Sequence, residues 1–254
     1  MAKIISLVNQ KGGTAKTTTT VNLGAYLAAM GKYVLLIDLD PQANATSGVG
    51  VNREDTDKTL YHILANQASF DEIIKKTSLF GYDIIPSSAD LAGAVVELIN
   101  DPRREFKLYD VLHGIRTNYD YILIDCPPSL GLLTINGLTA ADSVIIPVQC
   151  EYYALEGLSQ LLKTIQLVKE NLGSELDVMG AVLTMYDKRN RLAREVVKEV
   201  RLNFPGRVFD AIIPRCVRLA EAPSFGQTIL QFDIKSAGAQ AYRQLAEEVI
   251  NLET

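Results

Sequence analysis

The sequence has few of the residues that define several classes of proteins. It contains three cysteines and two histidines among 254 residues, and no tryptophan. Cys126, Cys150 and Cys216 are widely spaced and form no CxxC pair, so neither a disulfide framework nor a zinc site is indicated. We expect buried thiols in a reducing compartment. His62 and His113 lie outside every motif, which argues against histidine-based metal or triad chemistry.

Long apolar runs are also missing. The longest ones, residues 33–37 and 144–148, are far shorter than the roughly 20 residues that a membrane helix needs. The first residues, MAKIISLVNQKGG, do not have the pattern of a secretory signal. The net charge of -5 argues against a uniformly basic nucleic-acid binder but leaves room for a local basic patch. These features predict a cytoplasmic protein.

Apolar runs with strand character alternate with helical patterns along the chain. Near-continuous apolar strands separated by helices are what a parallel sheet covered on both faces requires. We therefore predict an α/β fold with a doubly wound, mostly parallel sheet, and a single domain over residues 1–254, because no linker composition divides the chain. Residues 50–80 have the least readable pattern. The expected strands are 4–8, 33–37, 84–85, 121–124, 144–148, 178–183 and 208–213, and the expected helices are about 16–31, 155–171, 192–203 and 237–252.

A glycine- and lysine-rich segment, KGGTAKTT, follows the first expected strand and begins the first expected helix. Backbone N–H groups at a helix N-terminus bind phosphate, and glycines let the backbone approach it. Lys16 would reach the β- and γ-phosphates, and the Thr17 hydroxyl would bind Mg²⁺. A turn that merely joined a strand to a helix would not need two lysines at this spacing. The expected phosphate-binding residues are Lys11, Gly12, Gly13, Thr14, Ala15, Lys16, Thr17 and Thr18.

Acidic residues end two other expected strands. Asp38 and Asp40 follow the second strand, at the edge where parallel α/β sheets bind their ligands. Alone, this pair could belong to an ordinary turn, but beside a phosphate loop it indicates a site. Asp125 ends the strand at 121–124 and precedes Pro127 and Pro128, a position that suits a carboxylate holding Mg²⁺ through water.

Together these motifs resemble the ParA/MinD superfamily of P-loop NTPases, whose deviant Walker A motif is KGGxxK[ST]. The resemblance implies a slow ATPase with ATP and Mg²⁺ as cofactors. It also implies a homodimer that sandwiches ATP, in which Lys11 crosses to the nucleotide of the facing subunit. Asp40 would orient the attacking water, with Asp38 and Asp125 supporting Mg²⁺. Ala15 departs from the glycine usual in the family, and its methyl is tolerable if the local φ is negative.

Two C-terminal stretches, 183–189 and 213–224, resemble the chromosomal partition ATPases, so the resemblance covers nearly the whole chain. It implies that Pro214 lies against the adenine and that basic residues of both stretches contact DNA. Arg189 and Arg218 are the favoured DNA contacts, followed by Arg215 and Lys188. For the helical cations, a solvated face paired with Glu195 and Glu199 is an equally good interpretation. The basic residues of this region are Lys188, Arg189, Arg191, Arg194, Lys198, Arg201, Arg215 and Arg218.

The predicted function is ATP-dependent DNA partition, for a chromosome or a plasmid. ATP would close the dimer, the dimer would bind DNA of any sequence on the nucleoid, and hydrolysis would release it. By resemblance, a ParB-like centromere-binding protein would stimulate hydrolysis. Because few residues precede Lys11, we expect no N-terminal operator-binding extension and no autorepression.

Three alternatives share parts of this pattern. A membrane-recruited ATPase of the MinD type would end in a basic amphipathic helix, whereas residues 244–254 are acidic. Iron-protein-like reductases need paired or well-placed cysteines, which Cys126 alone does not provide. A non-hydrolysing DNA-binding or adaptor module, disabled by Ala15, would not need to keep all the other site residues. Those residues are Lys11, Lys16, Thr17, Asp40 and Asp125.

Overall fold

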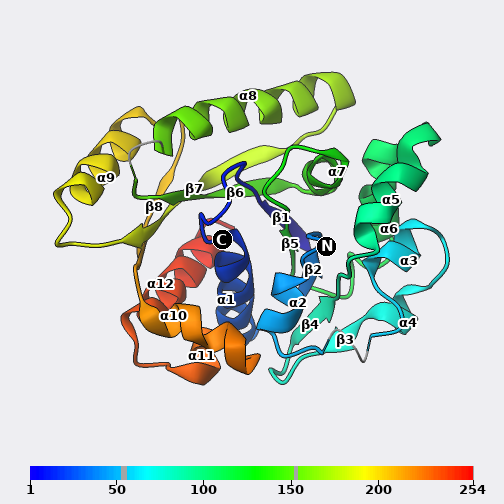
Figure 1. Ribbon diagram of the computed structural model, residues 1–254, viewed down its shortest axis with the longest axis horizontal. Helices are drawn as coiled ribbons and strands as arrows, with labels where there is room; N and C mark the ends of the chain where they lie inside the picture. The colour runs from blue at the N-terminus through cyan, green and yellow to red at the C-terminus, as the bar shows by residue number, and fades with distance from the viewer. Residues whose placement is uncertain (53–55, 152–153, 254) are drawn as a thin grey trace.

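The computed structural model of the chain describes residues 1–52, 56–151 and 154–253, with the backbone alone for 154–156. The strands that it contains are β1 (Lys3–Leu7), β2 (Val34–Asp38), β3 (Lys75–Lys76), β4 (Tyr82–Ile85), β5 (Tyr121–Asp125), β6 (Ser143–Gln149), β7 (Asp177–Tyr186) and β8 (Val208–Pro214). They form one sheet in the order β3-β4-β2-β5-β1-β6-β7-β8 (Figure 1). All neighbouring strands are parallel except the short edge strand β3, which runs antiparallel to β4.

Helices surround this sheet. They are α1 (Lys16–Ala29), α2 (Asn44–Gly48), α3 (Leu60–Leu64), α4 (Phe70–Ile73), α5 (Leu91–Glu97), α6 (Lys107–Leu112), α7 (Leu132–Ala140), α8 (Ala154–Leu172), α9 (Arg191–Asn203), α10 (Val217–Glu221), α11 (Ile229–Phe232) and α12 (Ala237–Asn251). Short 3-10 turns cover Leu98–Asn100, Arg104–Phe106 and Ala222–Phe225. None of the helices in the described ranges is long and apolar enough to cross a bilayer.

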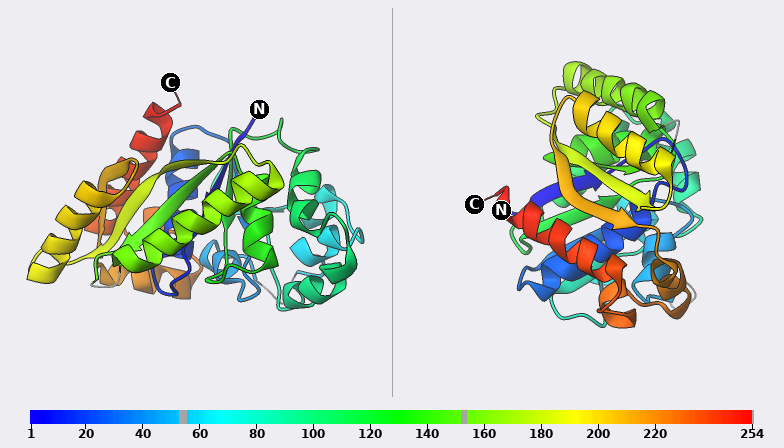
Figure 2. Two further views of the ribbon diagram at one scale, coloured as in Figure 1. Left: turned by 90° about the horizontal axis from the view of Figure 1, so that it is seen from above. Right: turned by 90° about the vertical axis from the view of Figure 1, so that its left-hand side faces the viewer.

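The sheet separates two apolar cores. Helices α1 and α12 cover one face, while α7, α8 and α9 cover the other (Figures 1 and 2). Successive strand residues point to opposite faces, so Ile5 and Leu7 pack in the core under α1 and α12, whereas Ile4 and Val8 pack in the opposite core. This arrangement confirms the predicted doubly wound α/β fold.

Most predicted elements agree with the structure to within one or two residues. The largest difference among the strands is β7, which continues to Tyr186, beyond the predicted end at residue 183. The sequence did not predict strand β3, helices α2 to α7 or helices α10 and α11. Helix α7, with the sequence LLTINGLTA, is buried on several sides, including Asn136 and Thr139. It therefore lacks the polar face that makes a surface helix recognisable in a sequence.

The expectation of buried thiols holds for two cysteines and is wrong for the third. Cys126 and Cys150 are buried, whereas Cys216 is half-buried at the start of α10, where the chain turns back over the sheet edge. All three are free thiols.

His62 is structural, since its ring Nδ1 accepts the backbone N–H of Thr59 at the start of α3.

Candidate nucleotide site

The segment between β1 and α1 is held by hydrogen bonds to residues that are far away in the sequence. Asn9 accepts the N–H of Lys11 at 3.0 Å through its side-chain oxygen, and its amide donates to the carbonyl of Pro147 at 2.7 Å. The hydroxyl of Thr184, on β7, donates to the carbonyl of Thr14 at 3.0 Å. A backbone carbonyl of β6 and a side chain of β7 thus help to fix the loop. Ala15 at the N-cap of α1 offers no side-chain acceptor, so the first N–H groups of the helix are available to a phosphate.

The two lysines of the motif have different surroundings. Lys16 is buried, and its ammonium donates to the carbonyl of Lys11 at 3.2 Å. Burial lowers the pKa of Lys16, an effect opposed by the nearby charges of Asp125 and Asp40. Within the described ranges Lys16 forms no ion pair, so this buried cation lacks a direct anionic partner. A phosphate would supply one.

Lys11 and Gly12, in contrast, lie on the surface. The ammonium of Lys11 pairs with Glu151 at 3.2 Å, and both side chains are about half exposed. A Cβ added at Gly12 or Gly13 would have no heavy atom within 4 Å. The outer side of the loop is therefore open in the single chain.

Asp125, at the end of β5, has the features of a cation-binding carboxylate. Its Oδ1 accepts the hydroxyl of Thr20 at 3.0 Å, and Thr17 lies close to the carboxylate. Its Oδ2 is buried and has no hydrogen-bond partner among the described residues. Burial, reinforced by the charge of Asp38, raises the pKa of Asp125 to about 7. A Mg²⁺ ion or its water shell would satisfy the orphaned oxygen and favour the ionised form.

The part of the chain that the structure describes has no group of three or more His, Cys, Asp or Glu arranged to hold a metal. Mg²⁺ in a nucleotide site is usually held by one or two protein ligands together with phosphates and water. Thr17 and Asp125 are the residues that would hold it here. The structure thus brings the phosphate loop and the acidic end of β5 close together.

Asp38 and Asp40 lie beside Asp125, because β2 and β5 are neighbours and Asp38 pairs with Asp125 in the register. Asp38 is fully buried, and burial raises its pKa to about 6, against hydrogen bonds from Thr46 and Asp40 that lower it. The carboxylate of Asp40 accepts the N–H of Gln42 at 2.9 Å and is almost completely buried. The carboxylates of both acids thus lie at the site, but that of Asp38 already accepts hydrogen bonds from Asp40 and Thr46.

A cavity of about 360 Å³ connects the phosphate loop with the end of β8. Its walls include Ala15 and Thr18 on one side and Met185, Pro214 and Val217 on the other. A largely apolar slot next to a phosphate site has the character needed for a planar base. The position of Pro214 is therefore compatible with the adenine contact implied by the resemblance.

Ala15 corrects one expectation from the sequence. Its φ is 65°, in the left-handed region, so the condition of a negative φ is not met. Ala43, in the loop that follows Asp40, has a φ of 51°. Left-handed backbone costs a residue with a Cβ about 1–2 kcal/mol. The loop before α1 and the loop after Asp40 therefore each contain a strained alanine.

Replacing Ala15 with glycine should relieve this strain. Because glycine also loses about 0.4–1 kcal/mol of unfolded-chain entropy on folding, we expect a net stabilisation of about 0.5–1 kcal/mol and a Tm increase of about 2 °C. ATP affinity should improve, since the methyl no longer borders the phosphates. Thermal unfolding and nucleotide titration measure both effects. Ala29→Gly, at the last helical residue of α1, is the control and should lower stability. A destabilised Ala15→Gly protein would contradict the strain argument.

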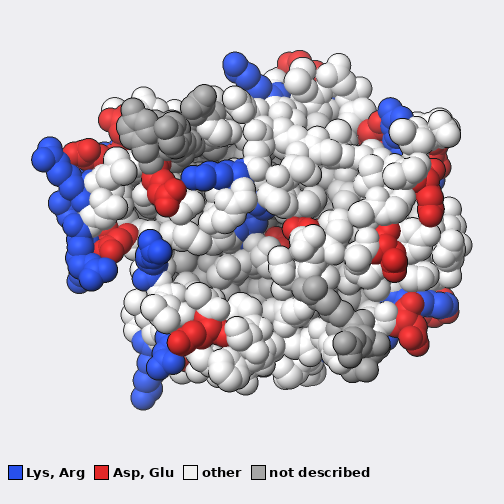
Figure 3. All heavy atoms as spheres, viewed as in Figure 1, with Lys and Arg blue, Asp and Glu red and all other residues white. Residues whose placement is uncertain are grey.

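Four basic residues gather at the ends of β7 and β8, where the backbone N–H of Arg215 donates to the carbonyl of Tyr186 at 2.9 Å. We call Lys188, Arg189, Arg215 and Arg218 the basic surface. All four are exposed, and Figure 3 shows Lys and Arg side chains on the side of the molecule that carries α9 and α10.

Acidic residues partner only some of these cations. Arg189 pairs with Asp187 at 2.8 Å, and Arg218 pairs with Glu221 at 3.0 Å and Asp233 at 3.6 Å. Lys188 and Arg215 form no ion pair with any described residue. Arg189 and Arg218, which the sequence analysis favoured as DNA contacts, are thus the two that form ion pairs.

The helical cations of this region match the solvated-face interpretation in part. Arg191 pairs with Glu195 at 2.9 Å, as that interpretation expects. Arg201 instead pairs with Asp210 at 3.3 Å, and Glu199 accepts the side-chain amide of Asn203. Arg194 and Lys198 are exposed and form no ion pair with any described residue, so only half of the cations on α9 are neutralised within the chain.

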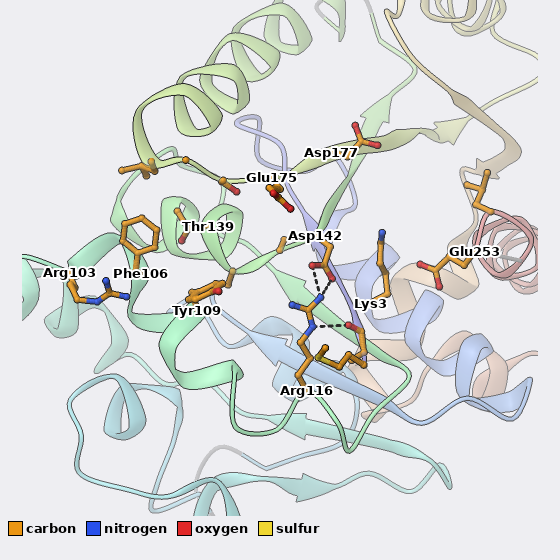
Figure 4. Close-up of a pocket in the computed structure, with 18 residues that line it drawn as sticks. Lys3, Arg103, Phe106, Tyr109, Arg116, Thr139, Asp142, Glu175, Asp177 and Glu253 are labelled. Carbon is orange, nitrogen blue, oxygen red and sulfur yellow. Dashed lines mark hydrogen bonds and ion pairs between the residues drawn. The ribbon is translucent and has the colours of Figure 1, made fainter.

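A second cavity, of about 1040 Å³, lies at the opposite edge of the sheet, near the starts of β1, β6 and β7 (Figure 4). Several of its polar groups bond to one another. Arg116 pairs with Asp142 at 2.5 Å and donates to the carbonyl of Ala2, while Asp142 accepts the N–H of Ile4. This network ties the start of β1 to the sheet, and we assign it a structural role.

Several site residues were not found from the sequence. Asn9, Thr20, Thr46 and Thr184 all bond to the loops or acids of the site. Their residue types are common in turns and helices, and their partners lie up to 170 residues away in the chain. Thr20 alone had a local signal, because it follows Lys16 by one helical turn on the same face.

The fold and the site define a P-loop nucleotide-binding protein. The AAA domain family matches residues 2–178. The sporulation initiation inhibitor protein Soj of Bacillus subtilis (strain 168) is 55% identical over 249 residues, which cover 98% of this chain and 98% of that protein. The chromosome partitioning protein ParA of Caulobacter vibrioides (strain NA1000 / CB15N) is 52% identical over 253 residues, covering 99% and 95%.

A solved structure is similar over the same length. Cobyrinic acid a,c-diamide synthase from Mycobacterium smegmatis, with bound ADP and magnesium, has a TM-score of 0.87 and 36% identity, and the match covers 99% of this chain and 95% of that one. The chain belongs to the Soj/ParA family of chromosome partitioning ATPases.

Proposed function

We propose that this chain is a DNA-partition ATPase that dimerises with ATP, binds DNA without sequence preference in that state and releases it on hydrolysis. As a member of a family of ATPases it hydrolyses ATP, with ATP and Mg²⁺ as cofactors. The observation that carries the proposal is the convergence of the buried Lys16, Asp40 and the orphaned oxygen of Asp125 at one edge of the sheet. We treat residues 1–254 as a single functional domain.

The residues of this chain would share the work of phosphoryl transfer. The amide groups at the start of α1 and Lys16 hold the phosphates, and Thr17 and Asp125 hold Mg²⁺, which neutralises developing charge when bound. Asp40 orients the attacking water, while Asp38 supports the Mg²⁺ side of the site. Catalysis of this kind consists mostly of positioning and electrostatic stabilisation.

Dimerisation is supported by the exposure of Lys11 and Gly12 in the phosphate loop. Lys11 is held by one surface ion pair, which is worth about 0–1 kcal/mol and is easily exchanged for a phosphate. The space around Gly12 allows a second loop to approach closely. We therefore propose an ATP-sandwich dimer in which Lys11 contacts the nucleotide of the facing subunit.

Gly12→Val should block this dimer while leaving the single chain intact. The added side chain meets open space in the monomer, so folding and monomeric ATP binding should change little. It would intrude between two facing loops, so the ATP-dependent dimer should disappear. Size-exclusion chromatography with a non-hydrolysable ATP analogue measures this. Gly114→Val, also in open space and away from the loop, is the control. A persistent Gly12→Val dimer would contradict the sandwich.

DNA binding is the part of the proposal that needs the most direct test. A dimer whose arginines meet phosphates should bind unrelated duplexes about equally, because phosphates carry no sequence information. If two subunits neutralise roughly 6 phosphates, the slope of log affinity against log salt should be about -5. DNA binding should require ATP and be lost with ADP. Absence of binding by the wild-type ATP state would remove the partition proposal.

Variants of the basic surface locate the contact. Lys188→Ala and Arg215→Ala should each flatten the salt slope by about 2, because a dimer loses two contacts. Arg189→Ala and Arg218→Ala should have smaller effects, since carboxylates already partner these cations. Arg103→Ala is the control, because Arg103 is an exposed, acid-paired arginine beside the cavity at the opposite edge (Figure 4). Equal binding by all variants would place the DNA surface elsewhere.

The alternative functions are less well supported. The apolar face of α12, with Tyr242, Leu245 and Val249, packs in the core, so this helix is not free to lie on a bilayer. Cys126 is buried beneath the site and burial raises the pKa of its thiol, which does not suit a cluster ligand. We further propose association with the nucleoid and stimulation by a ParB-like partner, which the similarity to Soj and ParA supports.

A further inference from the structure

The loop that carries Asp40 is fastened at both ends by one carboxylate. Asp38 accepts the N–H of Asp40 at 3.2 Å through Oδ1. Its Oδ2 accepts both the N–H of Thr46, at 2.8 Å, and the hydroxyl of Thr46, at 2.7 Å. The chain between these contacts is a tight turn, closed by a hydrogen bond from the N–H of Ala43 to the carbonyl of Asp40. The path of the Asp40 loop therefore depends on Asp38.

Thr46 connects this carboxylate to a second strand. Its hydroxyl donates to Asp38 and at the same time accepts the N–H of Ser87 at 3.0 Å. Ser87 follows β4, which is the neighbour of β2 in the sheet. One hydroxyl thus joins the end of β2, the helix α2 and the end of β4. We call the three residues Asp38, Thr46 and Ser87 the clamp.

Burial makes the clamp sensitive to the loss of that hydroxyl. Asp38 and Thr46 are fully buried, and Ser87 is 1% exposed. Without the hydroxyl, the N–H of Ser87 would have no acceptor and Asp38 would lose a donor, both away from water. Unpaired buried groups are costly, so the local backbone is expected to shift to repair them. The segment nearest to such a shift is the strained turn that contains Ala43 and carries Asp40.

We propose that Thr46 is a positioning residue for ATP hydrolysis, which acts through Asp38 and Ser87 to fix the loop that presents Asp40 to the attacking water. This inference rests on the proposed role of Asp40 in orienting that water. Thr46 does not contact the phosphate loop in the described contacts, so its effect is on turnover and not on nucleotide binding. It also gives Asp38 a defined task, which is to hold the loop in place.

Thr46→Val tests the proposal because it keeps the shape of the side chain and the backbone N–H but removes the hydroxyl. We expect kcat to fall roughly 10- to 100-fold, the effect of displacing a catalytic group by about 1 Å. The ATP dissociation constant and the ATP-dependent dimer should be nearly unchanged. Thr46→Ser restores the hydroxyl and should restore kcat. Thr139→Val is the matched control, since Thr139 is a buried, hydrogen-bonded threonine in α7, away from the site.

A double variant separates this inference from the assignment of Asp40. If Thr46 acts through Asp40, Thr46→Val should not slow the Asp40→Ala protein any further. Additive losses, an unchanged kcat in Thr46→Val, or a loss of ATP affinity equal to the loss of kcat would each overturn the proposal. If Thr46→Val unfolds, Thr46→Ala and Thr46→Ser give the same comparison with smaller side chains. Full turnover by Asp40→Ala alone would instead remove the role of Asp40.

Discussion

Lys16→Ala is expected to abolish tight ATP binding. Lys16 is a buried cation without a carboxylate partner in the described structure, and its ammonium now bonds only to the carbonyl of Lys11. Removing one partner of a buried, hydrogen-bonded charge pair costs about 2–5 kcal/mol. ATP affinity should therefore fall roughly 30- to 5000-fold, as measured by titration with a fluorescent nucleotide in the presence of Mg²⁺.

The other lysine of the motif is the matched control for this loss. Lys11→Ala removes an exposed cation on the outer side of the loop, so the single chain should still bind ATP but should fail to dimerise. Lys16→Ala itself should fold normally, because burial already disfavours the charged form of this lysine. Wild-type ATP affinity in Lys16→Ala would refute the assignment of the phosphate loop.

The sequence predicted the main elements of the site because their signals are local. The segment from Lys11 to Thr18 combines glycines, two lysines and a strand-to-helix boundary, and the structure places that boundary at Lys16. Asp38 and Asp125 were expected at the carboxyl ends of two buried strands, and the structure shows that these strands are neighbours with the two acids paired in the register of β2 and β5. Parallel sheets bring such strand ends together whatever the intervening chain does.

The features that the sequence did not predict depend on contacts between distant segments or on backbone conformation. Ala15 has a left-handed φ in a loop that Asn9 and Thr184 fasten, and an alanine at this position does not predict that conformation. The charges of the basic surface were visible in the sequence, but their partners were not. Asp233, for example, pairs with Arg218 from the connection between α11 and α12. Sequence reasoning therefore identified segments that the fold brings together, but it missed the contacts that hold them in place.

Asp40→Ala should bind ATP and dimerise but hydrolyse ATP far more slowly. In the proposed site the phosphate contacts would come from α1 and Lys16, which the substitution does not touch, so nucleotide affinity should remain close to that of the wild type. Loss of a group that positions the attacking water or takes its proton costs typically 10²- to 10⁴-fold in rate. The expected outcome is a dimer trapped in the ATP state, which single-turnover hydrolysis and size-exclusion chromatography would show together.

A second substitution distinguishes the chemical role of Asp40 from its structural one. The carboxylate also accepts the N–H of Gln42 at 2.9 Å, so Asp40→Ala removes a turn-stabilising hydrogen bond as well as a charge. Asp40→Asn keeps an acceptor for that N–H but not the negative charge. If the charge matters for the water, Asp40→Asn should be as slow as Asp40→Ala, whereas a turnover close to wild type would show that Asp40 serves only to shape the loop.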